Sequence, residues 1–156
     1  MHGETDMTPR EALPQMTEIL NSGGSFRLMV TGNSMLPFLR HRQDRVILAP
    51  VSHPIRRGDI LFYLRGPEQC ILHRVHTVRP DGTLMMCGDS QVALEPIRAE
   101  QVLARATHVE RNGKQIPCSR LSLRMVCGLW IALRPVRPYL LAMLRKLHLV
   151  SFAVLD

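Results

Sequence analysis

The sequence has 156 residues, enough for one ordinary domain with a buried core and a short appendage. Hydrophobic residues make up 46% of it, which is typical of a folded chain and excludes a disordered one. The formal net charge is +7, but residues 1–118 hold fourteen Lys or Arg against twelve Asp or Glu, whereas residues 119–156 hold six against one. The basic character therefore belongs to the C-terminal tail.

The N-terminal segment predicts a helix. Thr8-Pro9-Arg10-Glu11 has the form of a capping box with proline at the first helical position, and Gly23-Gly24 ends the helix after about Leu20. Pro14 leaves two alternatives, a helix that starts late or one that is kinked. Residues 1–24 are assigned to an N-terminal helical arm.

From Ser25 onward, short apolar stretches alternate with turn residues, a pattern that predicts β-strands. Glycine-containing turns separate the stretches, and residues 79–83 and 111–114 are typical of hairpin tips. No helical pattern separates successive strands, which disfavours a doubly wound α/β fold. We expect a mainly β domain over residues 25–118, built from coiled antiparallel sheets or a partly open barrel. The expected strands are 26–31, 44–49, 59–64, 69–78, 83–87 and 101–111.

Residues 119–156 predict a basic amphipathic tail of two apolar helices around a proline break at Pro135. The longest uncharged stretch, Met125 to Leu133, is far short of the roughly 20 residues that span a bilayer, so no transmembrane helix is expected. Such a tail suits the surface of a membrane, docking on a membrane partner, or packing on its own domain, and the sequence leaves these open. The protein is expected to be membrane-associated at the periphery, or cytoplasmic.

The cysteines Cys70, Cys87, Cys118 and Cys127 lack the spacing of metal ligands, and we expect free thiols. His73 and His76, three residues apart on one strand, point to opposite faces and so do not share a metal. Neither a metal nor a cofactor is expected.

The most informative motif is Thr31-Gly32-Asn33-Ser34-Met35-Leu36-Pro37, where a strand ends in glycine and a turn exposes the hydroxyl of Ser34. It is not the nucleophile elbow of α/β-hydrolases, which needs glycine where this chain has Leu36. A serine hydroxyl needs a neighbouring base to become a nucleophile. Lys114, near an expected hairpin tip, and Lys146, in the tail, are poorly placed for this role.

In chain order, Ser-Met-x-Pro, Asp44-Arg45-Val46, Arg57-Gly58-Asp59, His73-Arg74 and Cys87-Gly88-Asp89 resemble the conserved boxes of type I signal peptidases and LexA-type serine peptidases. Histidine in place of the lysine base is similar to the archaeal and endoplasmic-reticulum-type variant. The resemblance covers residues 28 to about 106.

This resemblance implies that Ser34 is the catalytic nucleophile, that His73 is the general base, and that the backbone N–H of Ser34 contributes to the oxyanion hole. It also implies an acid that orients the imidazole. Asp89 is the first candidate for this acid, and Glu95, six residues further on, is the alternative.

The implied function is a serine endopeptidase that cleaves leader, signal or precursor peptides, bound extended alongside a strand with small residues before the cleaved bond. The alternative is a non-catalytic or LexA-like regulatory β domain whose basic tail binds a membrane or a partner. A LexA-type self-cleaving regulator would need an internal cleavage site and a DNA-binding domain, but the 25 residues before the β region are too few for a helix-turn-helix. No nucleic-acid partner is expected.

Overall fold

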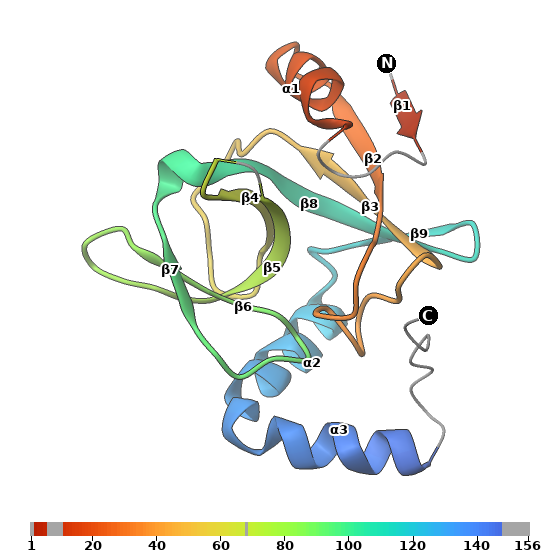
Figure 1. The fold of residues 1–156 in the computed structure, drawn as a ribbon, viewed down its shortest axis with the longest axis vertical. Helices are drawn as coiled ribbons and strands as arrows, with labels where there is room; N and C mark the ends of the chain where they lie inside the picture. Colours follow the sequence, from red (N-terminus) through yellow and green to blue (C-terminus); the bar gives the residue numbers. More distant parts are fainter. Residues whose placement is uncertain (1, 6–10, 68, 148–156) are drawn as a thin grey trace.

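The computed structural model describes residues 2–5, 11–67 and 69–147, and these form a mainly β structure (Figure 1). The strands are β1 (His2–Thr5), β2 (Ser25–Met29), β3 (Asp44–Ala49), β4 (Ile60–Arg65), β5 (Gln69–Val78), β6 (Leu84–Cys87), β7 (Glu95–Ile97), β8 (Val102–Arg111) and β9 (Lys114–Pro117). The helices are α1 (Leu13–Asn21), α2 (Leu121–Ala132) and α3 (Arg137–Lys146), with short 3₁₀ turns η1 (Ala99–Gln101) and η2 (Arg134–Val136).

The strands form one sheet in the order β1-β2-β3-β8-β4-β5-β6-β7, with β9 paired to β8. Neighbouring strands are antiparallel, except that β1 runs parallel to β2. The sheet is strongly coiled but does not close into a barrel (Figure 1). The predicted fold class, mainly β with antiparallel pairing, is therefore confirmed.

The six expected strands are confirmed within two residues at either end, and so are the two hairpin tips. Glycine at positive φ forms these tips, with Gly82 at 81° and Gly113 at 74°. The sequence does not predict β1, β7 or β9, each of which is four residues long or shorter. Of these, β7 matters most for the candidate site because it carries Glu95.

Helix α1 begins at Leu13 rather than at Thr8, and Pro14 lies in its first turn, where its missing N–H is not needed. The late start is thus the correct alternative, whereas the capping box at Thr8 extends into residues outside those described. Met16 of α1 is buried in an apolar cluster together with Phe26 of β2. This helix therefore covers one face of the sheet.

Alternation of side chains along β4 sends successive residues into two apolar clusters, one on each face of the sheet. Ile60 and Phe62 join the cluster that α1 covers, while Leu61 and Tyr63 join the other. Because β4 is buried on both faces, a polar group on it has to find its hydrogen-bonding partner inside the protein.

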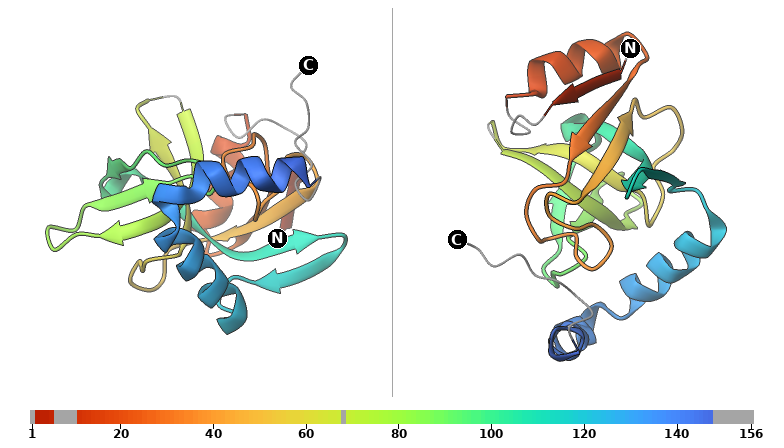
Figure 2. Two further views of the ribbon diagram at one scale, coloured as in Figure 1. Left: turned by 90° about the horizontal axis from the view of Figure 1, so that it is seen from below. Right: turned by 90° about the vertical axis from the view of Figure 1, so that its right-hand side faces the viewer.

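The predicted pair of C-terminal helices is confirmed as α2 and α3, which lie at the end of the molecule opposite α1 (Figures 1 and 2). Trp130 of α2 donates from Nε1 to the Asp89 carbonyl oxygen at 2.8 Å, which fixes the helix to the turn after β6. Over the described ranges, no helix is long and apolar enough to cross a membrane.

Candidate active site

Ser34 lies in the loop that connects β2 to β3. Gly32 enters the loop with a φ of 85°, which side chains rarely adopt, and its N–H donates to His41 Nδ1 at 2.8 Å. Met35 and Leu39 are buried and belong to the apolar cluster that α1 covers. Burial of these two side chains therefore fixes the part of the loop that follows Ser34.

A buried carboxylate holds the far end of this loop. Asp44 has no exposed surface and accepts hydrogen bonds from the Arg40 backbone N–H at 2.9 Å and from the guanidinium groups of Arg40 and Arg111, at 2.8 and 2.7 Å. Burial alone would raise the pKa of Asp44, but the hydrogen bonds from Arg111 and Arg40 outweigh it and lower this pKa to about 2. Arg111 also donates to the Phe38 carbonyl oxygen at 2.6 Å, which ties the loop to β8.

The backbone at Ser34 is bonded to the turn that follows β6. The Ser90 N–H donates to the Ser34 carbonyl oxygen at 2.8 Å, and the Ser90 hydroxyl donates to the Asn33 carbonyl oxygen at 2.9 Å. Gly88 permits this close approach, because a Cβ there would lie 2.7 Å from the Ser34 carbonyl oxygen. Neither the N–H nor the hydroxyl of Ser34 bonds to any described residue.

His73 lies on β5 and is 4% exposed. Its Nδ1 is 3.3 Å from the hydroxyl of Tyr63 on β4, and this hydroxyl donates to Glu95 Oε2 at 2.8 Å. Burial and the hydrogen bond to Glu95 raise the pKa of Tyr63, so its hydroxyl stays protonated. Since that proton is directed at Glu95, the Tyr63 oxygen accepts from Nδ1–H of His73. This assigned tautomer leaves a lone pair on Nε2, as a general base requires.

Burial, more than the surrounding charges, keeps His73 neutral. Burial lowers the pKa of His73, the charge of Arg65 lowers it further, and Glu95 and Asp89 oppose both, with a result of about 4. Arg65 also donates to both carboxylate oxygens of Glu95, from Nε at 2.6 Å and from a terminal nitrogen, and lowers the pKa of that carboxyl. At pH 7 a neutral imidazole therefore lies beside an ionised Glu95.

Asp89 is held by a different partner. Arg74 donates from Nε to Oδ1 at 2.8 Å and from a terminal nitrogen to Oδ2 at 2.7 Å, and both side chains are buried. Because successive residues of a strand point to opposite faces, Arg74 points away from the face that carries His73. The resemblance makes Asp89 the first candidate for the acid that orients His73. In the structure, however, the hydrogen bonds connect the alternative candidate, Glu95, to His73 through Tyr63.

A cavity of about 780 Å³ lies on the His73 side of the sheet. His73 and Ser90 line it from the sheet and the turn after β6, and Leu141 and Arg145 line it from α3. Ser34 does not line this cavity, and no hydrogen bond joins its hydroxyl to His73. The structure thus brings the Ser34 backbone to the cavity wall through Ser90, without joining the hydroxyl to the imidazole.

A second cavity, of about 840 Å³, lies between α2 and β8 and is the larger of the two. Arg74, Cys127 and Ile131 are among its lining residues, but neither Ser34 nor His73 is. Of the two candidate residues, only His73 therefore lines one of these cavities, and it lines the smaller one.

Three residues of this arrangement are missed by sequence reasoning: Tyr63, Arg65 and Ser90. Tyr63 stands in the apolar run of β4 and is indistinguishable there from a core residue, although a buried phenol needs a partner. Ser90 directly follows the Gly88-Asp89 pair, and nothing in the local sequence marks its hydroxyl as a partner of the Ser34 loop. The one usable signal is the Tyr63 hydroxyl within the otherwise apolar run 60–64.

In the described ranges, no three His, Cys, Asp or Glu side chains gather as the ligands of a metal ion would. No disulfide joins the four cysteines, all of which are described. A search against known protein families found no family that matches, and a search of curated proteins found no match either. The function is therefore inferred from the arrangement of the residues.

Proposed function

We propose that this protein is a serine endopeptidase in which Ser34 is the nucleophile and His73 the general base. The observation that supports this most directly is the environment of His73. The imidazole is buried and neutral at pH 7, its Nδ1 is directed at Tyr63, and its Nε2 has no partner among the described residues. A cavity on the same side offers space for a substrate.

In the proposed reaction, His73 Nε2 removes the proton of the Ser34 hydroxyl while Ser34 Oγ attacks a peptide carbonyl carbon. The imidazolium gives this proton to the leaving amine as the C–N bond breaks, which leaves an acyl ester on Ser34. Water then attacks the ester while His73 takes its proton, and the acid product and free hydroxyl form. The Ser34 N–H, unbonded within the described structure, donates to the oxyanion.

The proposal assigns Tyr63 and Glu95 to positioning. A pKa of about 4 makes His73 a weaker base than a free histidine, so formation of the imidazolium depends on nearby negative charge. Glu95 supplies that charge through the Tyr63 hydroxyl, and Asp89 adds to it without a hydrogen bond. Ser34 Oγ must come within about 3 Å of Nε2 for proton transfer, and substrate binding has to complete that geometry.

The proposed substrates are leader, signal or precursor peptides. This part rests on the resemblance of the Ser34 and His73 motifs to signal peptidases. Such a site binds its substrate as an extended peptide alongside a strand, with small residues before the cleaved bond.

Labelling with a fluorophosphonate, followed by mass-spectrometric mapping, tests the nucleophile without knowledge of the substrate. The label should map to Ser34 and be lost in Ser34→Ala. Ser90→Ala is the matched control, because it removes the neighbouring hydroxyl, which already donates to Asn33, and should keep the label. A label on Ser90 or elsewhere would overturn the assignment.

The role of the base is tested by the labelling rate. His73→Gln should lower it by about 10²- to 10⁴-fold, the usual contribution of a general base. Tyr63→Phe should lower it less, and should move the His73 tautomer toward Nε2–H in nitrogen-15 spectra because Nδ1–H loses its acceptor. An unchanged tautomer in Tyr63→Phe would mean that Tyr63 does not position the ring.

A non-catalytic β domain with a basic binding tail is the alternative function. One observation favours it, namely that no hydrogen bond joins Ser34 to His73. A folded protein that takes no label at Ser34 and cleaves no peptide would support this alternative.

A further inference from the structure

Helices α2 and α3 expose two rows of large apolar side chains. In each row the residues are four apart, and every one of them is between 51% and 78% exposed: Leu121, Met125 and Leu129 on α2, and Tyr139, Met143 and Leu147 on α3 and at its end. The buried positions Cys127, Ile131 and Leu141 are two residues away from members of these rows, which is roughly 200° around a helix. The rows, here called the helical face, therefore point away from the sheet.

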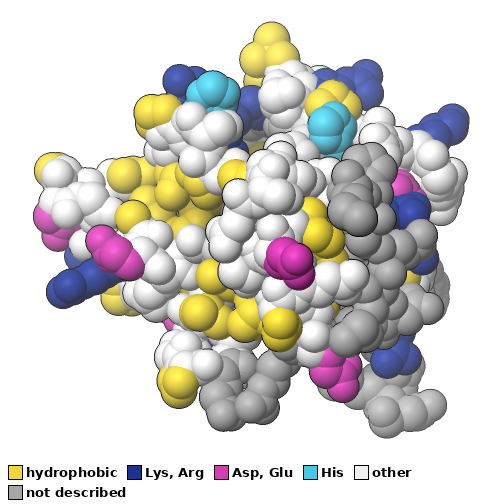
Figure 3. Space-filling model, turned by 90° about the horizontal axis from the view of Figure 1, so that it is seen from above, with side chains coloured by type: hydrophobic (Ala, Val, Ile, Leu, Met, Phe, Trp, Pro, Cys, Tyr) yellow, Lys and Arg dark blue, Asp and Glu magenta, His cyan; other side chains and the backbone are white. Residues whose placement is uncertain are grey.

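The helical face carries basic charge and no described acid. Arg120 and Lys146 are exposed beside it, and the described residues from 119 to 147 include no Asp or Glu. By contrast, the end of the molecule with α1 shows both acidic and basic side chains (Figure 3). The C-terminal helices therefore differ from that end in combining exposed apolar rows with one sign of charge.

The two helices are already packed on their inner sides. Arg137 is 1% exposed and donates to the carbonyl oxygens of Gly88 and Gln91, while Trp130 donates to that of Asp89. Turning the apolar rows inward would break these bonds. No described part of the chain is then left to cover the rows, so we look for their cover outside the described residues.

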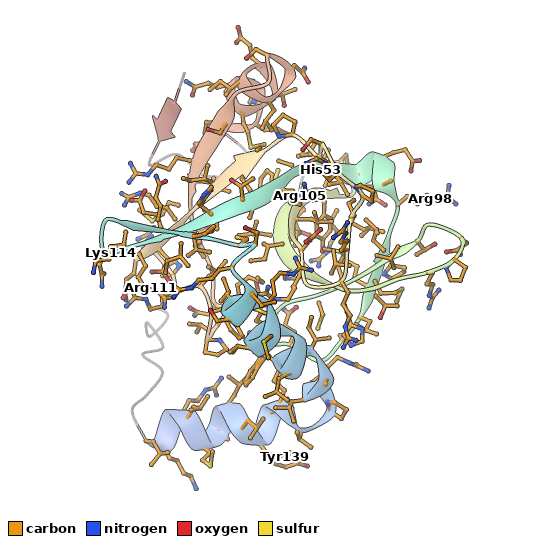
Figure 4. The ribbon with its side chains drawn as sticks, turned by 180° about the vertical axis from the view of Figure 1, so that it is seen from behind. His53, Arg98, Arg105, Arg111, Lys114 and Tyr139 are labelled. Carbon is orange, nitrogen blue, oxygen red and sulfur yellow. The ribbon has the colours of Figure 1, made fainter. Side chains whose placement is uncertain are left out.

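We propose that the helical face binds the surface of a membrane that contains anionic lipids. Apolar side chains enter the headgroup layer, basic side chains attract lipid phosphates, and Tyr139, which projects from the side of α3 away from the sheet (Figure 4), suits the boundary between them. A second copy matches less well, because a two-fold interface would bring Arg120 and Lys146 near residues of the same charge.

The lipid contact goes beyond the proposed peptidase activity, but one consequence rests on that activity. Leu141 and Arg145 on the inner side of α3 line the cavity that holds His73. A bound helical face would hold this cavity about one helix diameter, roughly 10 Å, from the lipid surface. Peptides that emerge from a membrane would then be within reach of the proposed site.

Co-sedimentation of the full chain with vesicles tests the lipid contact. Vesicles of phosphatidylcholine with about 30% phosphatidylglycerol should bind at least tenfold more tightly than vesicles of phosphatidylcholine alone. Raising the salt concentration from about 0.1 M to about 0.5 M should remove most of this difference. Equal binding to both vesicles, or no binding to either, would overturn the proposal.

Two variant pairs locate the contact. Leu129→Ser/Tyr139→Ser should weaken binding to anionic vesicles at least tenfold, whereas the control Val51→Ser/Val78→Ser, on exposed valines elsewhere, should stay within twofold of the wild type. Circular dichroism establishes that both are folded.

Likewise, Arg120→Gln/Lys146→Gln should weaken this binding at least fivefold, and Arg79→Gln/Lys114→Gln, with the same loss of charge at the hairpins, should not. If either helical variant binds like its control, the proposal is wrong.

Other occupants give different results. The wild type could instead fail to bind vesicles and sediment as a dimer, with Leu129→Ser/Tyr139→Ser sedimenting as a monomer. This result would make the helical face an interface between copies and would overturn the lipid contact. Ser34→Ala should bind vesicles like the wild type, so failure of the proposed peptidase function is distinguishable from failure of this inference.

Discussion

Mild acid should destabilise the folded protein, and His73 should account for a large share of the loss. Burial, with the charge of Arg65, lowers the pKa of His73 from 6.5 to about 4. Between these two pH values the unfolded chain binds a proton at this position that the folded protein does not. The free energy of unfolding therefore falls as the pH falls. The total contribution of His73 to this loss is about 3 kcal/mol, of which about 2 kcal/mol is lost between pH 7 and about pH 4.5.

Urea denaturation at the two pH values measures this loss in the wild type and in His73→Gln, since glutamine keeps a polar side chain but does not titrate. The variant should lose about 2 kcal/mol less than the wild type on acidification, whatever its stability at pH 7. His53→Gln, on an exposed histidine, is the control and should follow the wild type. An equal loss in the wild type and His73→Gln would refute the buried neutral imidazole, and with it the proposed base.

Two further predictions concern the loop that carries Ser34. Gly88→Ala should lower the free energy of unfolding by about 1–3 kcal/mol, because its Cβ would lie 2.7 Å from the Ser34 carbonyl oxygen. Gly128→Ala, whose Cβ meets nothing within 4 Å, should be neutral or stabilising, and equal stabilities of the two variants in urea would contradict the first prediction. Asp44→Asn should cost about 2 kcal/mol at pH 7, because the carboxyl has a pKa of about 2 when folded and 3.8 otherwise. The contribution of the ionised carboxylate is present above pH 3.8 and is lost as the pH falls toward 2. If the difference in unfolding free energy between Asp44→Asn and the wild type does not shrink in acid, the ionised carboxylate is not its source.

The strands of this fold are predictable because their ends are marked by residues with a physical reason to be there. Gly82 and Gly113 adopt positive φ at hairpin tips, and apolar runs between such turns have the length of strands. Strand β7 has no such signal, since it is three residues long and contains Pro96. Its pairing with β6 arises from the path of the whole chain, which a local pattern does not contain.

The candidate site likewise has residues that the sequence identifies and residues that only the three-dimensional structure identifies. The motifs identify Ser34 and His73 as residues of interest, and strand alternation alone separates His73 from Arg74. The partner of Asp89 depends on which buried charge lies nearest in three dimensions, and that charge is Arg74. Tyr63 acquires its role only because β4 and β7 bring its hydroxyl between His73 and Glu95, a juxtaposition of residues far apart in sequence.

The C-terminal helices contribute to the position of Ser34. Arg137 is buried and pairs with no carboxylate within the described structure, so its charge depends on the carbonyl oxygens of Gly88 and Gln91. A buried cation is costly unless such partners are held in place, which links the docking of α3 to the conformation of this turn. The same turn carries Ser90, whose N–H and hydroxyl bond to the backbone of the Ser34 loop. Hydrogen bonds of Arg137 and Ser90 therefore join α3 to the Ser34 loop through this turn, and the tail is a structural part of the candidate site.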